Sequence, residues 1–151
     1  MISENNFTGS DSPSSEPPTT HENAAPPNSF ELSTFKQFLF LRKDLKDFSE
    51  GGLVAQGSHA SVAAIYKTLS HPDTIRYLKD THILTTIVYG ITKNEIESVI
   101  KKLNDMGIEH ALWIENGEEP TCIGTRPIDV SKHPEFQNFR KKFRLFKRWK
   151  N

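Results

Sequence analysis

The chain has 151 residues, with 19 Lys and Arg against 19 Asp and Glu, so its formal net charge is zero. This length suits one domain with a single modest core. The one cysteine, Cys122, excludes an internal disulfide framework and fits a reducing compartment. No apolar run is long enough to cross a bilayer, so we expect a soluble protein with no membrane partner.

The charge is unevenly distributed. Residues 1–34 contain five acids and no Lys or Arg, whereas the remainder holds all 19 bases against 14 acids, a net of +5. The first segment is rich in Pro, Ser, Thr and Asn, and it buries too little apolar surface to offset the entropy of ordering. We predict a disordered tail over 1–34 and an ordered, basic domain over 35–151. The tail resembles neither a secretory nor a mitochondrial signal, which favours a cytoplasmic location.

From residue 35 the pattern predicts strands that alternate with helices. The aromatic and aliphatic run 35–41 is typical of a buried strand. Apolar residues recur at intervals of three and four over 53–69 and predict a helix, which 70–73 interrupts before a short helix near 77–78. The β-branched run 83–89 predicts a second strand.

The second half begins with a capping box, Thr92 to Glu95, which predicts a helix that ends at Gly107. Short strands are expected at 111–114 and 121–125, and the few turn residues between them indicate an antiparallel hairpin. His133-Pro134 predicts the start of a last helix. The sum is an α/β fold of three layers, α/β/α, with a four-stranded mixed, mostly parallel sheet.

Residues 51–61 are the most informative stretch. A glycine turn precedes a helix whose first two turns carry Gln56, Ser58 and His59. The unpaired N–H groups of a helix start suit a phosphate or an oxyanion, and the carboxyl edge of an open α/β sheet is where ligands usually bind. His59 is either a general base or a histidine that fixes the helix on the sheet. Gln56 orients a neighbour or binds substrate, and Ser58 binds substrate or satisfies a backbone carbonyl.

Four segments form a recognisable set: Leu-Arg-Lys-Asp-Leu at 41–45, Val-Ala-Gln-Gly-Ser-His-Ala at 54–60, Leu-Trp-Ile-Glu at 112–115, and the strand from Thr121 to Pro127. Together they resemble the class II peptidyl-tRNA hydrolase family, and the likeness covers about residues 36–147. Within the family the chain is most similar to a divergent branch, the peptidyl-tRNA hydrolase domain-containing proteins. The resemblance implies an α/β/α fold, hydrolysis of the ester between a peptide and tRNA by an activated water, a homodimer, and no metal or other cofactor.

The family's proposed catalytic residues carry over only in part. Its loop lysine falls on Gly52, its aspartate on Glu115, and one of its threonines on Thr121, while the loop of the other threonine is shortened to 118–120. Gln56, Ser58 and His59 match the family outright. The resemblance therefore implies His59, Glu115 and Thr121 as catalytic candidates, with Gln56, Ser58 and Gly52 near the substrate.

Without the lysine that the resemblance implies, the oxyanion of the tetrahedral intermediate lacks the positive charge that would stabilise it most. We considered Lys43 and Arg126 as replacement cations, and the amides of Gly52 and Leu53 as partial substitutes. Glu115 either positions the water and accepts its proton or is an ordinary solvated carboxylate at a strand end.

The C-terminal segment 139–150 has seven bases, no acids and interleaved aromatic residues. Helical spacing of the rings predicts that they pack on the sheet and leave a positive face, which suits a tRNA phosphate backbone; an ordinary solvated helix is the alternative. The candidate RNA-binding residues are Arg140, Lys141, Lys142, Arg144 and Lys147, and Lys43, Lys101 and Lys102 could extend the patch.

Two functions remain open. The first is a peptidyl-tRNA hydrolase, and the second is a catalytically impaired relative that binds tRNA or another RNA as an adaptor. Cys122 is expected to be a buried small hydrophobe rather than a nucleophile. No pair among the six histidines and the cysteine has metal-ligand spacing, so we predict no metal site.

Overall fold

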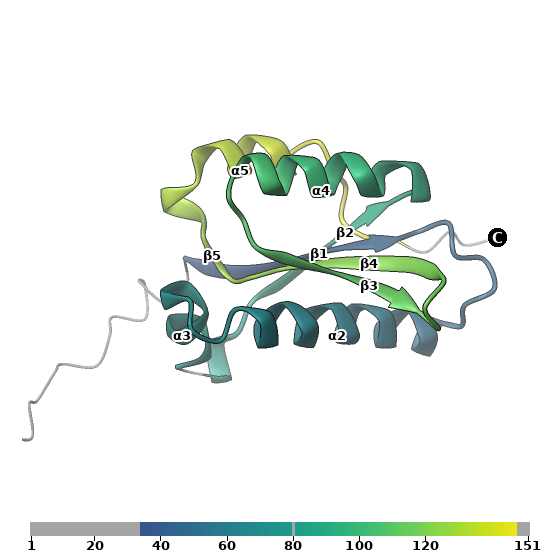
Figure 1. Ribbon diagram of the computed structural model, residues 1–151, viewed down its shortest axis with the longest axis horizontal. Coiled ribbons are helices and arrows are strands. Elements are labelled where there is room, and N and C mark those ends of the chain that lie inside the picture. Colours follow the sequence, from purple (N-terminus) through teal and green to yellow (C-terminus); the bar gives the residue numbers. More distant parts are fainter. Residues whose placement is uncertain (1–33, 80, 148–151) are drawn as a thin grey trace, which may run out of the picture.

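The computed structural model describes residues 34–79 and 81–147. All but Thr34 of the predicted tail, and the last basic residues of the C-terminal segment, lie outside the described residues. The elements, labelled as in Figure 1, are β1 (Phe35–Arg42), α2 (Glu50–Lys67), α3 (Pro72–Leu78), β2 (Thr86–Ile91), α4 (Ile96–Asp105), β3 (His110–Glu115), β4 (Glu119–Thr125), β5 (Ile128–Asp129) and α5 (Pro134–Arg140). None of the described helices is long and apolar enough to cross a membrane.

The elements form three layers around one mixed sheet. The strand order is β2-β1-β4-β3, and β5 pairs with the start of β1. Helices α2 and α3 lie on one face and α4 and α5 on the other (Figure 1). The predicted three-layer α/β/α class is confirmed. The sheet has five strands rather than four, and only β1 and β2 are parallel, because the β3–β4 hairpin inserts β4 antiparallel beside β1.

Helix α2 begins three residues before the predicted start. Ser49 caps it: the Ser49 Oγ accepts a hydrogen bond of 3.0 Å from the amide of Gly52. Gly51 and Gly52 therefore belong to the first turn of the helix and do not form a turn before it. The apolar periodicity starts only at Leu53, because the capping turn contacts solvent more than the sheet.

The other predicted boundaries are nearly as expected. The capping box is confirmed, with the Thr92 amide donating to Glu95 Oε2 at 2.7 Å, and a short 3₁₀ turn over 93–95 leads into α4. Gly107 ends α4 in the left-handed region at φ +64°, which favours glycine. The strand predicted over 83–89 is shifted to Thr86–Ile91, because residues 81–83 form a 3₁₀ turn.

Alternating residues of β1 fill two separate cores. Phe38 and Phe40 point to the face of α4 and α5, and Leu39 and Leu41 point to the face of α2. Cys122 lies in the second core, which confirms the expectation of a buried small hydrophobe, and burial raises the pKa of its thiol to about 12.

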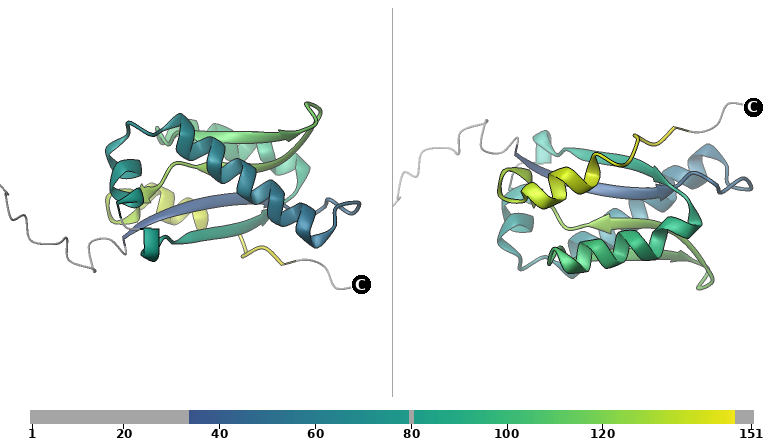
Figure 2. Two further views of the ribbon diagram at one scale, coloured as in Figure 1. Left: turned by 90° about the horizontal axis from the view of Figure 1, so that it is seen from below. Right: turned by 90° about the horizontal axis from the view of Figure 1, so that it is seen from above.

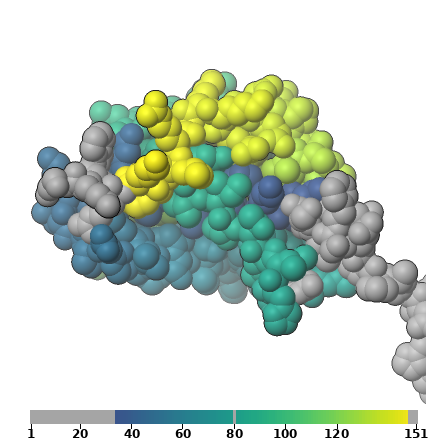
Figure 3. All heavy atoms as spheres, turned by 180° about the vertical axis from the view of Figure 1, so that it is seen from behind, coloured from purple at the N-terminus to yellow at the C-terminus, as the bar shows by residue number. Residues whose placement is uncertain are grey.

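The C-terminal segment does not continue α5 as a helix. After Arg140 the chain turns, and residues 144–146 run beside β2: the Gly90 amide donates to Arg144 O at 3.0 Å, and the Phe146 amide donates to Val88 O at 2.8 Å. Figure 3 shows the yellow C-terminal residues lying against the teal residues of β2. This path carries Phe146 to the core on the α2 face, whereas Phe136, Phe139 and Phe143 pack on the opposite face.

Candidate active site

One end of the sheet gathers most of the predicted site residues. Strands β1, β2 and β3 all finish at this end, and α2 and β4 begin there (Figure 1). The antiparallel register places Glu115, the last residue of β3, opposite Glu119, the first residue of β4. The sequence-predicted position of the site at a carboxyl edge therefore agrees with the topology of the sheet.

Trp113 joins two of the catalytic candidates. Its ring lies 4.6 Å, centroid to centroid, from the ring of His59, which is exposed on α2. The indole Nε1 donates a hydrogen bond of 3.0 Å to Glu115 Oε2. The half-buried carboxylate of Glu115 is thus held on one side by an indole N–H, with a second oxygen available to accept from water. An anchored carboxylate with a free oxygen can hold and deprotonate a water molecule.

A β-bulge directs Thr121 toward α2. The pairing of β3 and β4 shifts between Trp113 and Ile114 and skips Thr121, so Thr121 has no register partner. The Thr121 hydroxyl donates to Gln56 Oε1 at 2.8 Å, and both side chains are buried, with Thr121 fully inaccessible. This burial contradicts direct contact of Thr121 with substrate. We reassign Thr121 and Gln56 as positioning residues that fix α2 over the hairpin.

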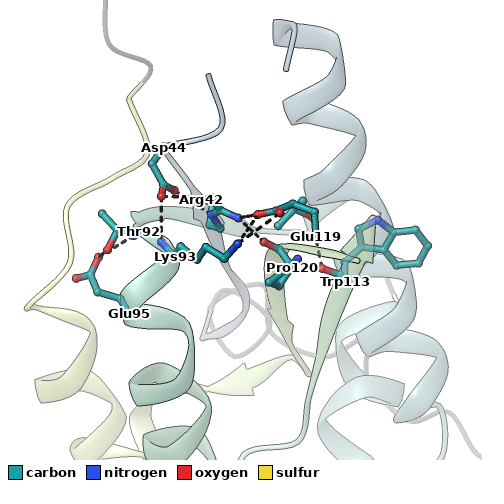
Figure 4. Close-up of polar contacts among 9 residues, drawn as sticks. Arg42, Asp44, Thr92, Lys93, Glu95, Trp113, Glu119 and Pro120 are labelled. Carbon is teal, nitrogen blue, oxygen red and sulfur yellow. Dashed lines mark hydrogen bonds and ion pairs between the residues drawn. The ribbon is translucent and has the colours of Figure 1, made fainter. Parts of the chain in front are cut away.

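A cluster of four charges lies at the same end of the sheet, where β1 ends and the turn into α4 begins (Figure 4). The buried Arg42 pairs with Asp44 through Nε at 2.9 Å, and its Nη1 contacts Glu119 and donates to Pro120 O at 2.9 Å. The Lys93 Nζ lies 3.3 Å from Glu119 Oε1, and the backbone amide of Lys93 donates to Asp44 Oδ2 at 3.2 Å. Two cations and two carboxylates therefore balance one another across the ends of β1, β2 and β4.

The guanidinium of Arg42 fixes the charge states of this cluster. Burial alone would lower the pKa of Arg42, but its bonds to Asp44 and Glu119 outweigh that effect and raise it. The hydrogen bond from Arg42 lowers the pKa of Glu119. For Asp44, burial would raise the pKa, but the bonds from Arg42 and the Lys93 amide lower it. All three groups stay charged near neutral pH.

The first turn of α2 offers no side-chain cation or free amide at Gly52, the position where the resemblance implies a lysine. Gly52 has no side chain, and its amide already donates to Ser49 Oγ. The amide of Leu53 donates to Ser49 O at 3.0 Å. The expectation that these two amides act as oxyanion donors is therefore wrong, because the helix's own cap occupies them.

Arg126 is also excluded as a replacement cation. It follows β4, at the opposite end of the sheet from Gly52, and only 4% of its side chain is exposed. There it pairs with Asp73 and Glu109, each at 2.7 Å. Lys43 remains at the expected end, exposed and packed by its stem against Gly90. The candidate Ser58 is exposed on the other flank of α2 from His59, where it lines a groove.

Replacing Arg126 with methionine is expected to destabilise the fold by about 2–4 kcal/mol, because it leaves Asp73 without its buried partner. Burial would raise the pKa of Glu109, but its hydrogen bonds, including that from Arg126, lower it. The stability from this pair is therefore complete above the ordinary glutamate pKa and lost as the pH falls through the folded value. Urea unfolding at several pH values measures both effects, and unchanged stability would contradict the buried pair.

The predicted RNA-binding residues differ in their surroundings. Arg140 is tied inward: its Nη1 donates to Tyr89 Oη at 3.1 Å, and its Nε donates to Gln137 Oε1 at 2.7 Å. The other four are exposed on the turn and the extended segment after α5, not on one helical face: Lys141, Lys142, Arg144 and Lys147.

Sequence reasoning gave no role to Trp113, Arg42, Lys93 or Glu119. Trp113 was visible only as part of a family-like segment, and its contact with His59 depends on how α2 crosses β3. The charge cluster joins residues up to 77 positions apart, from Arg42 to Glu119, so no local spacing could reveal it. Among the described residues, His, Cys, Asp and Glu side chains form no group of three that could hold a metal ion.

Comparison with known proteins shows the family of this chain. Residues 35–146 match the family described as Peptidyl-tRNA hydrolase PTH2. Two relatives, from Mus musculus and Homo sapiens, both carry the name "Putative peptidyl-tRNA hydrolase PTRHD1". Each is 36% identical to this chain over 117 residues, which cover 74% of this chain and 81% of the relative. The family match begins at β1 and ends with the segment that borders β2, so it includes every element of the site. The chain therefore belongs to the PTH2 family of peptidyl-tRNA hydrolases.

Proposed function

We propose that this protein hydrolyses the ester that joins a peptide to the terminal ribose of tRNA. The observation that carries the proposal is the anchored carboxylate of Glu115, at the strand end where the family resemblance implies an acid. Glu115 accepts a proton as water attacks the ester carbonyl. The tetrahedral intermediate then collapses, the proton passes to the leaving ribose oxygen, and free peptide acid and tRNA result.

We further propose that Lys93 supplies the positive charge that Gly52 lacks. Its side chain is 56% exposed, so it can leave Glu119 and turn toward an oxyanion. Glu119 would keep its bond to Arg42 when Lys93 moves, so no carboxylate is left uncompensated. In this arrangement His59 helps to orient the attacking water. The exposed bases after α5 bind the phosphates of the tRNA. We expect the enzyme to be cytoplasmic and homodimeric.

The test is incubation of the purified protein with an N-acetylated aminoacyl-tRNA, with release of deacylated tRNA followed on acid gels. Turnover above the spontaneous rate supports the proposal. A rate equal to that of buffer alone, from folded protein that still binds the tRNA, would remove it.

A second function, an RNA-binding adaptor without chemistry, is favoured by one specific observation. Gly52 has no side chain at the position where the resemblance implies a lysine, and the amides of Gly52 and Leu53 are already bonded to Ser49. This alternative predicts tRNA binding that falls steeply with salt and no hydrolysis under any condition. The same assay, run beside a filter-binding titration, separates the two.

The variant Lys93→Ala is expected to lower kcat by about tenfold to a hundredfold, because it removes a charge near the oxyanion. Lys132→Ala is the matched control, since Lys132 is likewise an exposed lysine paired with a carboxylate, that of Asp129, which pairs with the start of β1 at the opposite end of the sheet. Equal kcat values for the two variants would exclude Lys93 from the reaction.

A further inference from the structure

An apolar groove runs along the flank of α2 away from His59. Helix α2 crosses the sheet diagonally and does not cover β2, so β2 is left open on the face of the sheet that carries α2 (Figure 2). The groove has a volume of about 560 Å³, which is within the range of about 300–1,000 Å³ found for small-molecule sites. Its floor is formed by Leu39 and Leu41 of β1 with Val88 of β2, and Phe146 closes the far side.

One end of the groove lies at the first turn of α2, at the same end of the sheet as Glu115. Glu50 and Leu53, in the first turn of α2, line this end, and Val54 and Ser58 continue the wall. A molecule whose ester carbonyl lies near Gly52 can therefore extend into the groove without crossing the helix.

The charges around the groove indicate which part of a peptidyl-tRNA it accepts. The carboxylate of Glu50 lines it and repels phosphate, and its other polar groups are neutral hydroxyls. The exposed bases Arg144 and Lys147 flank Phe146 on the outer side, and Lys43 packs beside Phe146 at Gly90. RNA phosphates are thus attracted to the rim, whereas the interior suits uncharged apolar groups.

We propose that this groove binds apolar side chains of the peptide carried by the tRNA. The inference rests on the proposed function for its substrate, and it adds a preference: peptides with leucine-like residues next to the ester bind more tightly than peptides with serine there. Phe146, brought to the groove by the pairing of residues 144–146 with β2, forms part of this subsite.

The test uses full-length protein and two blocked dipeptides, N-acetyl-leucyl-leucinamide and N-acetyl-seryl-serinamide, titrated by NMR. We expect the leucine peptide to shift the signals of Val54, Val88 and Phe146 and to bind at least about tenfold more tightly than the serine peptide. Equal binding of both peptides, or shifts confined to the face of α4 and α5, would overturn the proposal.

Val54→Glu is the decisive variant, and Val62→Glu is its matched control. Both valines are exposed on α2, 73% and 63% respectively, but of the two only Val54 lines the groove. We expect Val54→Glu to weaken the leucine peptide by about tenfold or more and Val62→Glu to leave it unchanged. Identical affinities for the two variants would refute the groove as the binding site.

The outcome is separable from that of the proposed hydrolysis. Leucine-peptide binding in the groove without any turnover would remove the hydrolase and keep the subsite. Turnover with the same KM for leucyl and seryl substrates would keep the hydrolase and remove the subsite. A short oligonucleotide ending in adenosine serves as a further probe: if it shifts the groove signals and the peptides do not, the groove binds RNA and the proposal is wrong.

Discussion

Substitution of Glu115 by glutamine is expected to lower kcat for N-acetylated aminoacyl-tRNA by about a hundredfold or more. Glutamine has nearly the same shape and can still accept the hydrogen bond that Trp113 Nε1 gives to Glu115. It cannot accept a proton from water. Because geometry is preserved and basicity is lost, kcat should fall while KM for the tRNA changes little.

Two further variants complete this experiment. Glu118→Gln removes an exposed carboxylate from the same hairpin turn and should leave kcat unchanged. Glu115→Asp retains a carboxylate with one methylene less and should recover part of the lost rate. If Glu115→Gln turns over as fast as the parent protein, Glu115 is not the base, and the adaptor function gains support.

Gly124→Ala is expected to destabilise the protein by on the order of 3 kcal/mol or to prevent folding. A Cβ at Gly124 would lie 2.8 Å from the carbonyl carbon of Ala60 and nearer still to its oxygen. Both are backbone atoms of α2, so no side chain can move aside. The helix would have to lift from β4, which would also separate Gln56 from Thr121.

Gly57→Ala is the matched control for this prediction. It lies in the same interface between α2 and the sheet, but its Cβ would meet only Leu39 Cδ1 at 3.5 Å, an ordinary contact. Alanine favours a helix over glycine by up to about 1 kcal/mol, so Gly57→Ala should be neutral or stabilising. Chemical unfolding of both variants measures the difference. Similar losses for both would show that close approach at Gly124 is not what holds α2.

Local patterns predicted most of the fold because short-range chemistry fixes most of its elements. The capping box at Thr92, the left-handed cap at Gly107 and the hairpin before Thr121 each depend on neighbours in sequence. The start of α2 differs from the prediction because two adjacent glycines favour a turn, whereas the cap by Ser49 draws both of them into the helix. The strand directions were also wrong in part, because pairing of β4 with β1 is a long-range choice.

The sequence predicts where the site lies better than it predicts what each residue does there. His59 and Glu115 do lie at one end of the sheet and are joined through Trp113. The role of Thr121 could not be read from sequence, since a bulge decides which face its side chain reaches. The location of Arg126 depends on the antiparallel pairing of β4 with β1, which places the end of β4 far from the start of α2.

The pairing of residues 144–146 with β2 bears on how the protein can be handled. These residues form hydrogen bonds with backbone groups of β2. Without them β2 would be an exposed edge strand, whose unpaired N–H and C=O groups can pair with another copy of the chain. A shortened chain that stops before Arg144 would expose the edge of β2 and the side chain of Val88 to other molecules. Affinity tags are therefore better placed after Asn151 through a flexible spacer than substituted for the final residues.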